Sequence, residues 1–145
     1  MKKLTLLFVF AVFICSASIL GQARKELNFG IIGANYEIPV HKNITIAPGI
    51  GTNLDIDWLN IGVKGNYYFD NLLFGISDSS WDVYGGVNAG YSVYMGDNKN
   101  DNSDVAFGLQ VGGRWFWNDK WGLYLEIGGG NVSGLSPGIG LTVKL

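Results

Sequence analysis

Five charged residues occupy polar positions in segments that otherwise alternate apolar with small residues: Lys64, Asp82, Arg114, Glu126 and Lys144. Arg114 and Glu126 lie on either side of a short turn at residues 118–120. If both segments are strands, Arg114 stands about opposite Tyr124 and Glu126 is a diagonal neighbour, within reach of an ion pair. Such a network could be a polar pathway, a ligand site, or a structural filling for a narrow barrel interior. We favour the structural interpretation.

The sequence does not indicate an enzyme, a cofactor or a metal site. His41 is the only histidine, and the nearest candidate serine, Ser77, is far along the chain, whereas a hydrolase needs base and nucleophile within hydrogen-bond reach. Oxygen-bearing side chains between Asp97 and Asp104 could suit Ca²⁺, but the central glycine and terminal glutamate of an EF-hand loop are missing, so we interpret the segment as a solvated loop. No Lys-Ser/Thr pair follows Gly128–Gly130, as a phosphate loop would require.

The segments that carry the charged residues have a period of two, which is typical of β-strands with two different faces. The clearest one runs from Val105 to Trp117, where the odd positions are apolar and the even positions are mainly small, polar or charged. The same alternation recurs at residues 44–50, 59–69, 82–93, 121–128 and 135–145.

Counting these segments leaves one strand to be found. Seven are evident, yet bacterial single-chain barrels have an even number of strands. The first segment, about Leu27 to Ile38, changes phase near Ile31-Ile32, which suggests a bulge. The eighth strand is either Leu72–Ile76, which is short, or a split or backward extension of the first segment. We predict an all-β fold: a single antiparallel up-and-down transmembrane β-barrel of eight strands.

The residue types on the two faces favour a membrane barrel over a soluble β-barrel or sandwich. The polar face is mostly Gly, Asn, Ser and Tyr with at most one charge per strand, as in a crowded lumen, and the apolar face of the best strands carries no charge. Only 15% of the residues are charged, against about 25% in a typical soluble domain. A net charge of -2 gives no electrostatic case for binding nucleic acid.

Aromatic residues gather at strand ends that an up-and-down barrel brings to one rim. Tryptophan and tyrosine belts of this kind favour a membrane interface. The predicted belt consists of Tyr68, Phe69, Trp81, Trp115, Trp117 and Trp121. Because outer-membrane barrels have short periplasmic turns and longer outside loops, the polar Met95–Asp104 connection should face out and the aromatic rim should face the periplasm.

The N-terminus has the features of a secretory signal. Lys2 and Lys3 precede an apolar run from Leu4 to Ile14, and small and polar residues follow. We expect residues 1–23 to be removed, with cleavage after Gly21 or Ala23, and residues 24–145 to form the barrel. The only cysteine, Cys15, lies in the removed part, so the mature chain should have no disulfide.

Several short motifs recur along the expected strands: Gly65-Asn66-Tyr67-Tyr68-Phe69-Asp70, Trp81-Asp82-Val83-Tyr84-Gly85-Gly86 with Gly90-Tyr91, Gly112-Gly113-Arg114-Trp115-Phe116, Leu125-Glu126-Ile127-Gly128 and the closing segment from Gly138 to Leu145. Together they resemble the late strands of the small outer-membrane β-barrel proteins of Gram-negative bacteria, of the OmpA/OmpX-like type. The resemblance implies an outer-membrane location, contact with lipid, and recognition of the C-terminal strand by the barrel-insertion machinery. The chain departs from the family in ending on Leu145 instead of an aromatic residue.

The function expected from these observations is structural or interaction-based, with a lumen packed by side chains and polar outside loops. The resemblance does not define an activity, because such barrels include structural, adhesive and enzymatic members. Two alternatives stay open: a small channel or ligand carrier through the outer membrane, and a secreted soluble β-barrel. An extracellular partner is not identified by the sequence.

Overall fold

The protein is an all-β, closed barrel of eight antiparallel strands. The computed structural model describes residues 23–69, 80–97, 104–130 and 138–145, so nearly all of the expected signal segment lies outside the described residues. No helix in these four ranges has the length and apolar character needed to cross a membrane.

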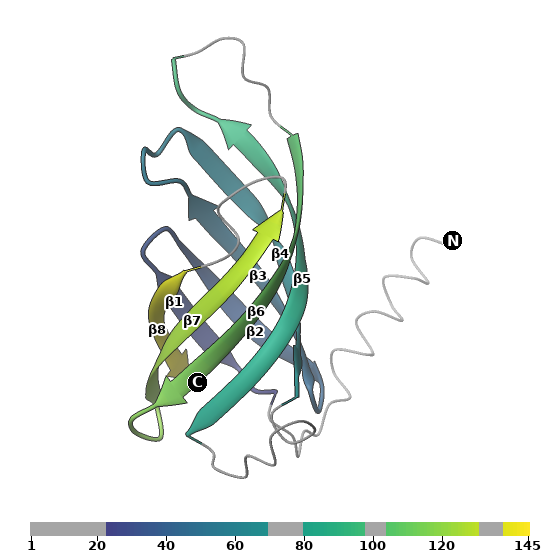
Figure 1. Cartoon of the computed structure of the whole chain (residues 1–145), viewed down its shortest axis with the longest axis vertical. Helices are drawn as coiled ribbons and strands as arrows, with labels where there is room; N and C mark the ends of the chain where they lie inside the picture. The colour runs from purple at the N-terminus through teal and green to yellow at the C-terminus, as the bar shows by residue number, and fades with distance from the viewer. Residues whose placement is uncertain (1–22, 70–79, 98–103, 131–137) are drawn as a thin grey trace, which may run out of the picture.

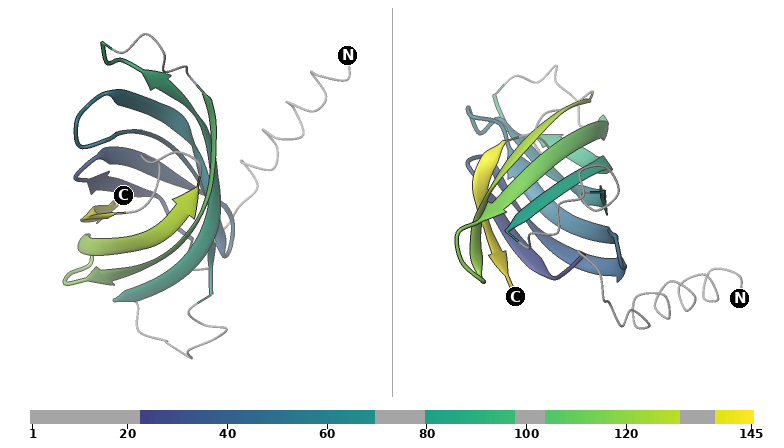
Figure 2. Two further views of the ribbon diagram at one scale, coloured as in Figure 1. Left: turned by 45° about the horizontal axis from the view of Figure 1, so that its top comes forward. Right: turned by 60° about the horizontal axis from the view of Figure 1, so that its bottom comes forward.

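The eight strands follow one another around the barrel in chain order, and the last pairs with the first (Figures 1 and 2). All neighbours are antiparallel, so the topology is the up-and-down arrangement that the alternation predicts. The pairing of β8 with β1 closes the sheet into a barrel. The strands are β1 (Glu26–Gly30), β2 (Gly33–His41), β3 (Ile44–Thr52), β4 (Trp58–Tyr68), β5 (Trp81–Tyr94), β6 (Asp104–Phe116), β7 (Trp121–Gly130) and β8 (Ile139–Lys144).

The strand missing from the sequence count comes from the first segment, which splits into β1 and β2. Residues Ile31 and Ile32 form the bend between them, and Phe29 pairs with Ala34 across it. The phase change there is therefore a hairpin turn, and the bulge expected at this point is wrong. An irregularity does occur in β2, between Pro39 and His41. The alternative strand Leu72–Ile76 lies outside the described residues.

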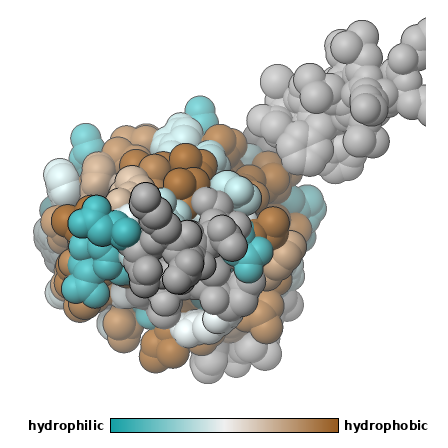
Figure 3. Space-filling view, turned by 90° about the horizontal axis from the view of Figure 1, so that it is seen from above, coloured by the Kyte–Doolittle hydropathy of each residue, from teal (hydrophilic) through white to brown (hydrophobic). Residues whose placement is uncertain are grey.

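Polarity is inverted relative to an ordinary soluble domain. Among the described residues, 14 polar or charged side chains are buried, against 8 apolar or aromatic ones. Exposed large apolar side chains instead lie on the outer surface of every strand except β2, for example Leu109 on β6 and Ile127 on β7, which are 65% and 66% exposed. Seen from above, apolar residues recur around the circumference (Figure 3).

Glycines make room for the large rings inside the barrel. Three interior aromatic residues each have a glycine directly opposite on the next strand: Tyr84 opposite Gly112, Phe116 opposite Gly122, and Tyr124 opposite Gly140. A Cβ atom added at Gly112 would lie 2.6 Å from the Tyr84 ring. The abundance of glycine in the sequence thus has a steric cause in a narrow lumen.

The two ends of the barrel differ in their connections. β1 begins and β8 ends at the same end, together with the β2–β3 and β6–β7 turns. The Asn118 side chain stabilises the latter by accepting hydrogen bonds from the backbone N–H groups of Lys120 (2.8 Å) and Trp121 (2.7 Å). We call the end of the barrel at which β1 begins and β8 ends the terminal end. The opposite end, which carries the β1–β2, β3–β4, β5–β6 and β7–β8 connections, is the loop end (Figure 1).

Two adjacent glycines on β6 test the steric account. We expect Gly112→Ala to lower the free energy of unfolding by about 1–3 kcal/mol, because the added methyl group overpacks against the buried Tyr84 ring. Gly113→Ala is the matched control, since its Cβ would meet only the backbone oxygen of Asp82 at 3.6 Å, an ordinary contact. Urea unfolding of the refolded protein measures both, and equal midpoints for the two variants would contradict the account.

Candidate functional site: the polar interior of the barrel

Among the described residues, eight charged side chains form a connected set in the barrel interior, and their charges cancel. The four cations are Arg24, Lys64, Arg114 and Lys144, and the four anions are Glu26, Glu37, Asp82 and Glu126. Together with the neutral polar residues around them, we call these the polar interior network. A balanced set is what a dry interior requires, because an unpaired buried charge is costly.

Arg114 is the centre of the network. Its side chain is 1% exposed, and it forms ion pairs with both Glu26 and Glu37 while donating a further hydrogen bond to the Tyr68 hydroxyl. The guanidinium also lies 4.4 Å from the centroid of the Tyr84 ring, within cation–π range. Among the described residues, Nε of Arg114 has no hydrogen-bond partner. The planar fork of arginine suits this site, since it contacts two carboxylates at once.

Glu37 is surrounded by donors from three strands. It accepts hydrogen bonds from Thr45 Oγ1 (2.7 Å), Tyr68 Oη (2.7 Å), Asn28 Nδ2 (3.1 Å) and Asn66 Nδ2 (3.2 Å), in addition to its ion pair with Arg114. These donors take the place of water around a carboxylate that is 1% exposed. The network therefore ties β1, β2, β3, β4 and β6 together across the lumen.

A second cluster fills the interior at the terminal end. Arg24 pairs with Glu26 at 2.6 Å and with Asp82, and its guanidinium lies 4.8 Å from the centroid of the Phe116 ring. Lys144 Nζ lies 3.7 Å from the centroid of the same ring. Arg24 and Lys144, from the start and the end of the barrel-forming sequence, thus both pack against Phe116 of β6.

A third cluster lies toward the loop end. Lys64 Nζ is 2.5 Å from Glu126 Oε2, and the Tyr84 hydroxyl donates to Glu126 Oε1 at 2.8 Å. Beside this pair, Gln110 bridges two strands: its Nε2 donates to Asn66 Oδ1 at 2.9 Å, and its Oε1 accepts from Asn88 Nδ2 at 2.7 Å. The amide groups continue the network without adding charge.

This arrangement fills and cross-links the barrel. Every charged group in it is engaged with another charge or an aromatic ring, and the described residues contain no group of three or more His, Cys, Asp or Glu side chains able to hold a metal ion. Removing one partner of a buried pair leaves an uncompensated charge, so such pairs enforce one arrangement of the strands even where they add little net stability.

All five charged residues predicted from the sequence lie inside the barrel, but their partners differ from the expected ones. The predicted ion pair between Arg114 and Glu126 is wrong, because Arg114 binds Glu26 and Glu37 while Glu126 binds Lys64. The register was predicted well, since Arg114 does stand opposite Tyr124. Strand neighbours proved a poor guide to pairing because long side chains reach across the lumen to distant strands.

The predicted aromatic rim is present at the terminal end for the four tryptophans. Trp81, Trp115, Trp117 and Trp121 all point outward and are 40–49% exposed, and the ring centroids of Trp81 and Trp115 are 6.4 Å apart. Tyr68 does not belong to this rim. It is 1% exposed and faces inward, where its hydroxyl bridges Arg114 and Glu37.

Phe69 and Phe116 show that a shift of one position along a strand decides whether a side chain faces the lumen or the outer surface. Phe69 follows the inward Tyr68, is half-buried, and lies over Gly85, whose added Cβ would be 3.2 Å from the ring. Phe116 stands between two outward tryptophans and is buried at 3% exposure, facing the cations of the terminal end. Alternation within each strand could therefore have assigned Tyr68 and Phe116 to the lumen.

Sequence reasoning missed Arg24, Glu26 and Glu37, which lie at the heart of the network. The expected first strand began at about Leu27, which left Arg24 and Glu26 outside it, and its disturbed phase obscured the inward position of Glu37. Within β1, Glu26 and Asn28 alternate with the outward Leu27 and Phe29, and within β2 Glu37 lies between Tyr36 and Ile38. Taking each half separately gives both glutamates an inward position.

Comparisons of the chain with protein-family models, with curated proteins and with solved structures each found no match. The fold and the geometry of the interior therefore carry the functional argument alone.

The Lys64–Glu126 pair can be tested by removing one partner. Glu126→Ala leaves Lys64 buried without its counter-charge, and we expect the free energy of unfolding to fall by about 3–5 kcal/mol. Adding Lys64→Met to that variant should recover part of the loss, because the stranded charge is then gone. Asp119→Ala, on the exposed β6–β7 turn, is the control and should change little. An unchanged urea midpoint for Glu126→Ala would refute the pairing.

Proposed function

We propose that this protein is a small outer-membrane β-barrel with a structural or interaction role. The observation that carries the proposal is the inverted polarity: a charge-balanced polar interior inside a wall whose outward side chains are large and apolar. In water, such a surface would expose far more contiguous apolar area than soluble monomers tolerate. In hydrocarbon, it is the favourable surface.

Backbone geometry supports the same proposal. In a membrane every backbone N–H and C=O must be satisfied within the protein, and a closed barrel does this without edges. A spanning strand needs roughly 9–11 residues. β2 to β7 have 9 to 14 residues each, which is enough to span. β1 and β8, which close the barrel, have only 5 and 6 residues and are the shortest strands.

The four outward tryptophans support an orientation. Interfacial tryptophans sit at the boundary between lipid and water. We infer that the terminal end lies in the periplasm, where the insertion machinery would read β8, and that the loop end faces outward. The loop-end connections are then the surface that would meet an extracellular partner.

The start of the barrel bears on the processing site. Ala23 is 2% exposed, packs with Tyr68 and Tyr84, and donates a backbone hydrogen bond to the Lys42 carbonyl at 3.1 Å. Arg24 forms two ion pairs inside the barrel. Arg24 is retained by either cleavage, but only cleavage after Gly21 keeps Ala23 and its contacts in the mature protein, so we favour it over cleavage after Ala23.

The packed interior argues against the alternative functions. An eight-stranded barrel has an interior just wide enough for side chains, and here Arg114, Tyr68 and Tyr84, each at most 1% exposed, fill its middle. That filling disfavours an open channel. A secreted soluble barrel would be expected to carry its apolar residues inside and its charges outside.

The proposal is tested by fractionating expressing bacteria and running the outer-membrane fraction on SDS gels with and without boiling. We expect the protein in that fraction, with a mobility that changes on boiling because the closed barrel resists cold SDS. Its intact mass should match a chain that begins at Gln22. Planar-bilayer recordings should be silent.

Three outcomes would count against the proposal. Recovery of the protein in the soluble periplasmic or extracellular fraction would favour the soluble barrel. Discrete conductance steps in the recordings would favour the channel. A mobility that boiling does not change would argue that no closed barrel forms in the membrane.

A further inference from the structure

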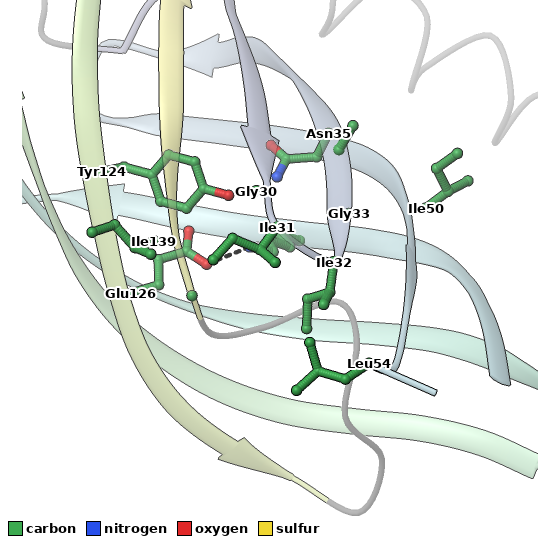
Figure 4. Close-up of a pocket in the computed structure, with 13 residues that line it drawn as sticks. Gly30, Ile31, Ile32, Gly33, Asn35, Ile50, Leu54, Tyr124, Glu126 and Ile139 are labelled. Carbon is green, nitrogen blue, oxygen red and sulfur yellow. Dashed lines mark hydrogen bonds and ion pairs between the residues drawn. The ribbon is translucent and has the colours of Figure 1, made fainter. Parts of the chain in front are cut away.

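The loop end of the lumen contains a cavity of about 250 Å³ that the polar interior network leaves unfilled (Figure 4). Its walls are apolar and come from parts of the chain that are distant in sequence: Ile31 and Ile32 of the β1–β2 turn, Leu54 after β3, and Ile139 of β8. Its base is the Lys64–Glu126 ion pair. The volume lies just below the roughly 300–1,000 Å³ of drug-sized ligand sites, so a small molecule fits the space.

The base of the cavity favours a ligand without net charge. Lys64 and Glu126 neutralise each other at 2.5 Å, and Glu126 also accepts from the Tyr84 hydroxyl. A ligand that brought one further charge to this place would lose its hydration without gaining a counter-ion. A hydroxyl or amide group has no such requirement and can both donate and accept.

Two neutral polar groups lie at the side of the cavity. The Tyr124 hydroxyl and the Asn35 amide both point toward the space between β7 and β2 (Figure 4). Asn35 uses its Oδ1 to accept from Asn28 at 2.9 Å, and its Nδ2 is the remaining donor. A few placed polar groups within an apolar wall are typical of sites that orient a small ligand.

The mouth of the cavity exposes large apolar side chains to water, which is energetically unfavourable. Ile31 and Leu54 are 76% and 79% exposed, although both stand in turns, where polar residues are usual. Two residues after Leu54, in the same turn, Ile56 has a φ of 59°, a conformation in which a β-branched residue is rare. Covering this mouth with an aliphatic chain would remove apolar surface from water.

We propose that this cavity binds a small uncharged amphipathic molecule, with an aliphatic chain against Ile31, Ile32 and Leu54 and a hydroxyl or amide end near Tyr124. The inference goes beyond the structural role proposed above, since that role assigns no ligand. It uses the loop-end cavity alone and leaves the packed middle of the lumen closed.

The test uses 1-octanol as the probe and the protein in lipid nanodiscs, followed by amide NMR shifts. Saturable shifts are expected at Gly30, Ile31, Tyr124 and Ile139. The blocking variant is Gly138→Leu: Gly138 lines the cavity, two residues before the inward Gly140, and its added Cβ would meet nothing within 4 Å. It should fill the cavity without a clash and abolish the saturable shifts.

Gly129→Leu is the matched control. A Cβ at Gly129 also meets nothing within 4 Å, but alternation with the inward Gly128 turns this position outward. The same substitution there should leave octanol binding unchanged. An unshifted amide pattern in the rest of the barrel, together with a boiling-dependent gel shift, establishes that both variants fold, so that a failure of binding is distinct from a failure of the barrel.

The polar end is tested by Tyr124→Phe and by the charge of the probe. Loss of the Tyr124 hydroxyl should weaken octanol binding about 2- to 10-fold, as expected for one hydrogen bond. Octanoate should bind more weakly than octanol because its carboxylate would approach Glu126. The proposal is overturned if octanol gives no saturable shift, if Gly138→Leu binds as the wild type does, or if octanoate binds more tightly than octanol.

Discussion

The rest of the structure depends on the burial of one guanidinium group. Arg114 is 1% exposed, and a cation in that position needs counter-charges that also lie out of water. Glu26 and Glu37 supply them, from strands that are 88 and 77 residues away in sequence. Tyr68, Thr45, Asn28 and Asn66 then satisfy the remaining lone pairs of Glu37. One buried charge thus fixes which strands face one another across the lumen.

The inward placement of these polar groups goes together with the apolar character of the outer wall. Strand alternation sends every second side chain outward, so a polar interior leaves the apolar residues outside. A glycine opposite each of Tyr84, Phe116 and Tyr124 lets the narrow interior close around these three rings. The interior and the wall are therefore two consequences of one pattern, and both agree with the membrane location that we propose.

The sequence predicted the fold class, the strand order and most inward positions, because alternation is a local property. It predicted the register between Arg114 and Tyr124 for the same reason, since a short turn sets it. Its pairing of Arg114 with Glu126 was wrong, because cross-lumen contacts depend on strands that are remote in sequence. The two-residue turn at Ile31-Ile32 was interpreted as a bulge because the alternation changes phase there, and this obscured the inward position of Glu37. The loop-end cavity had no sequence signal at all.

The most direct measurement of the central claim is tryptophan fluorescence of the protein in vesicles made with brominated phosphatidylcholines. Trp81, Trp115, Trp117 and Trp121 point outward at one end of the barrel, and bromine quenches only nearby indole rings. If the apolar wall lies in lipid, quenching should be strong with bromines near the headgroups and weaker with bromines at the bilayer centre. Fluorescence equal to that in unbrominated vesicles would contradict the account, because the wall would then not face lipid.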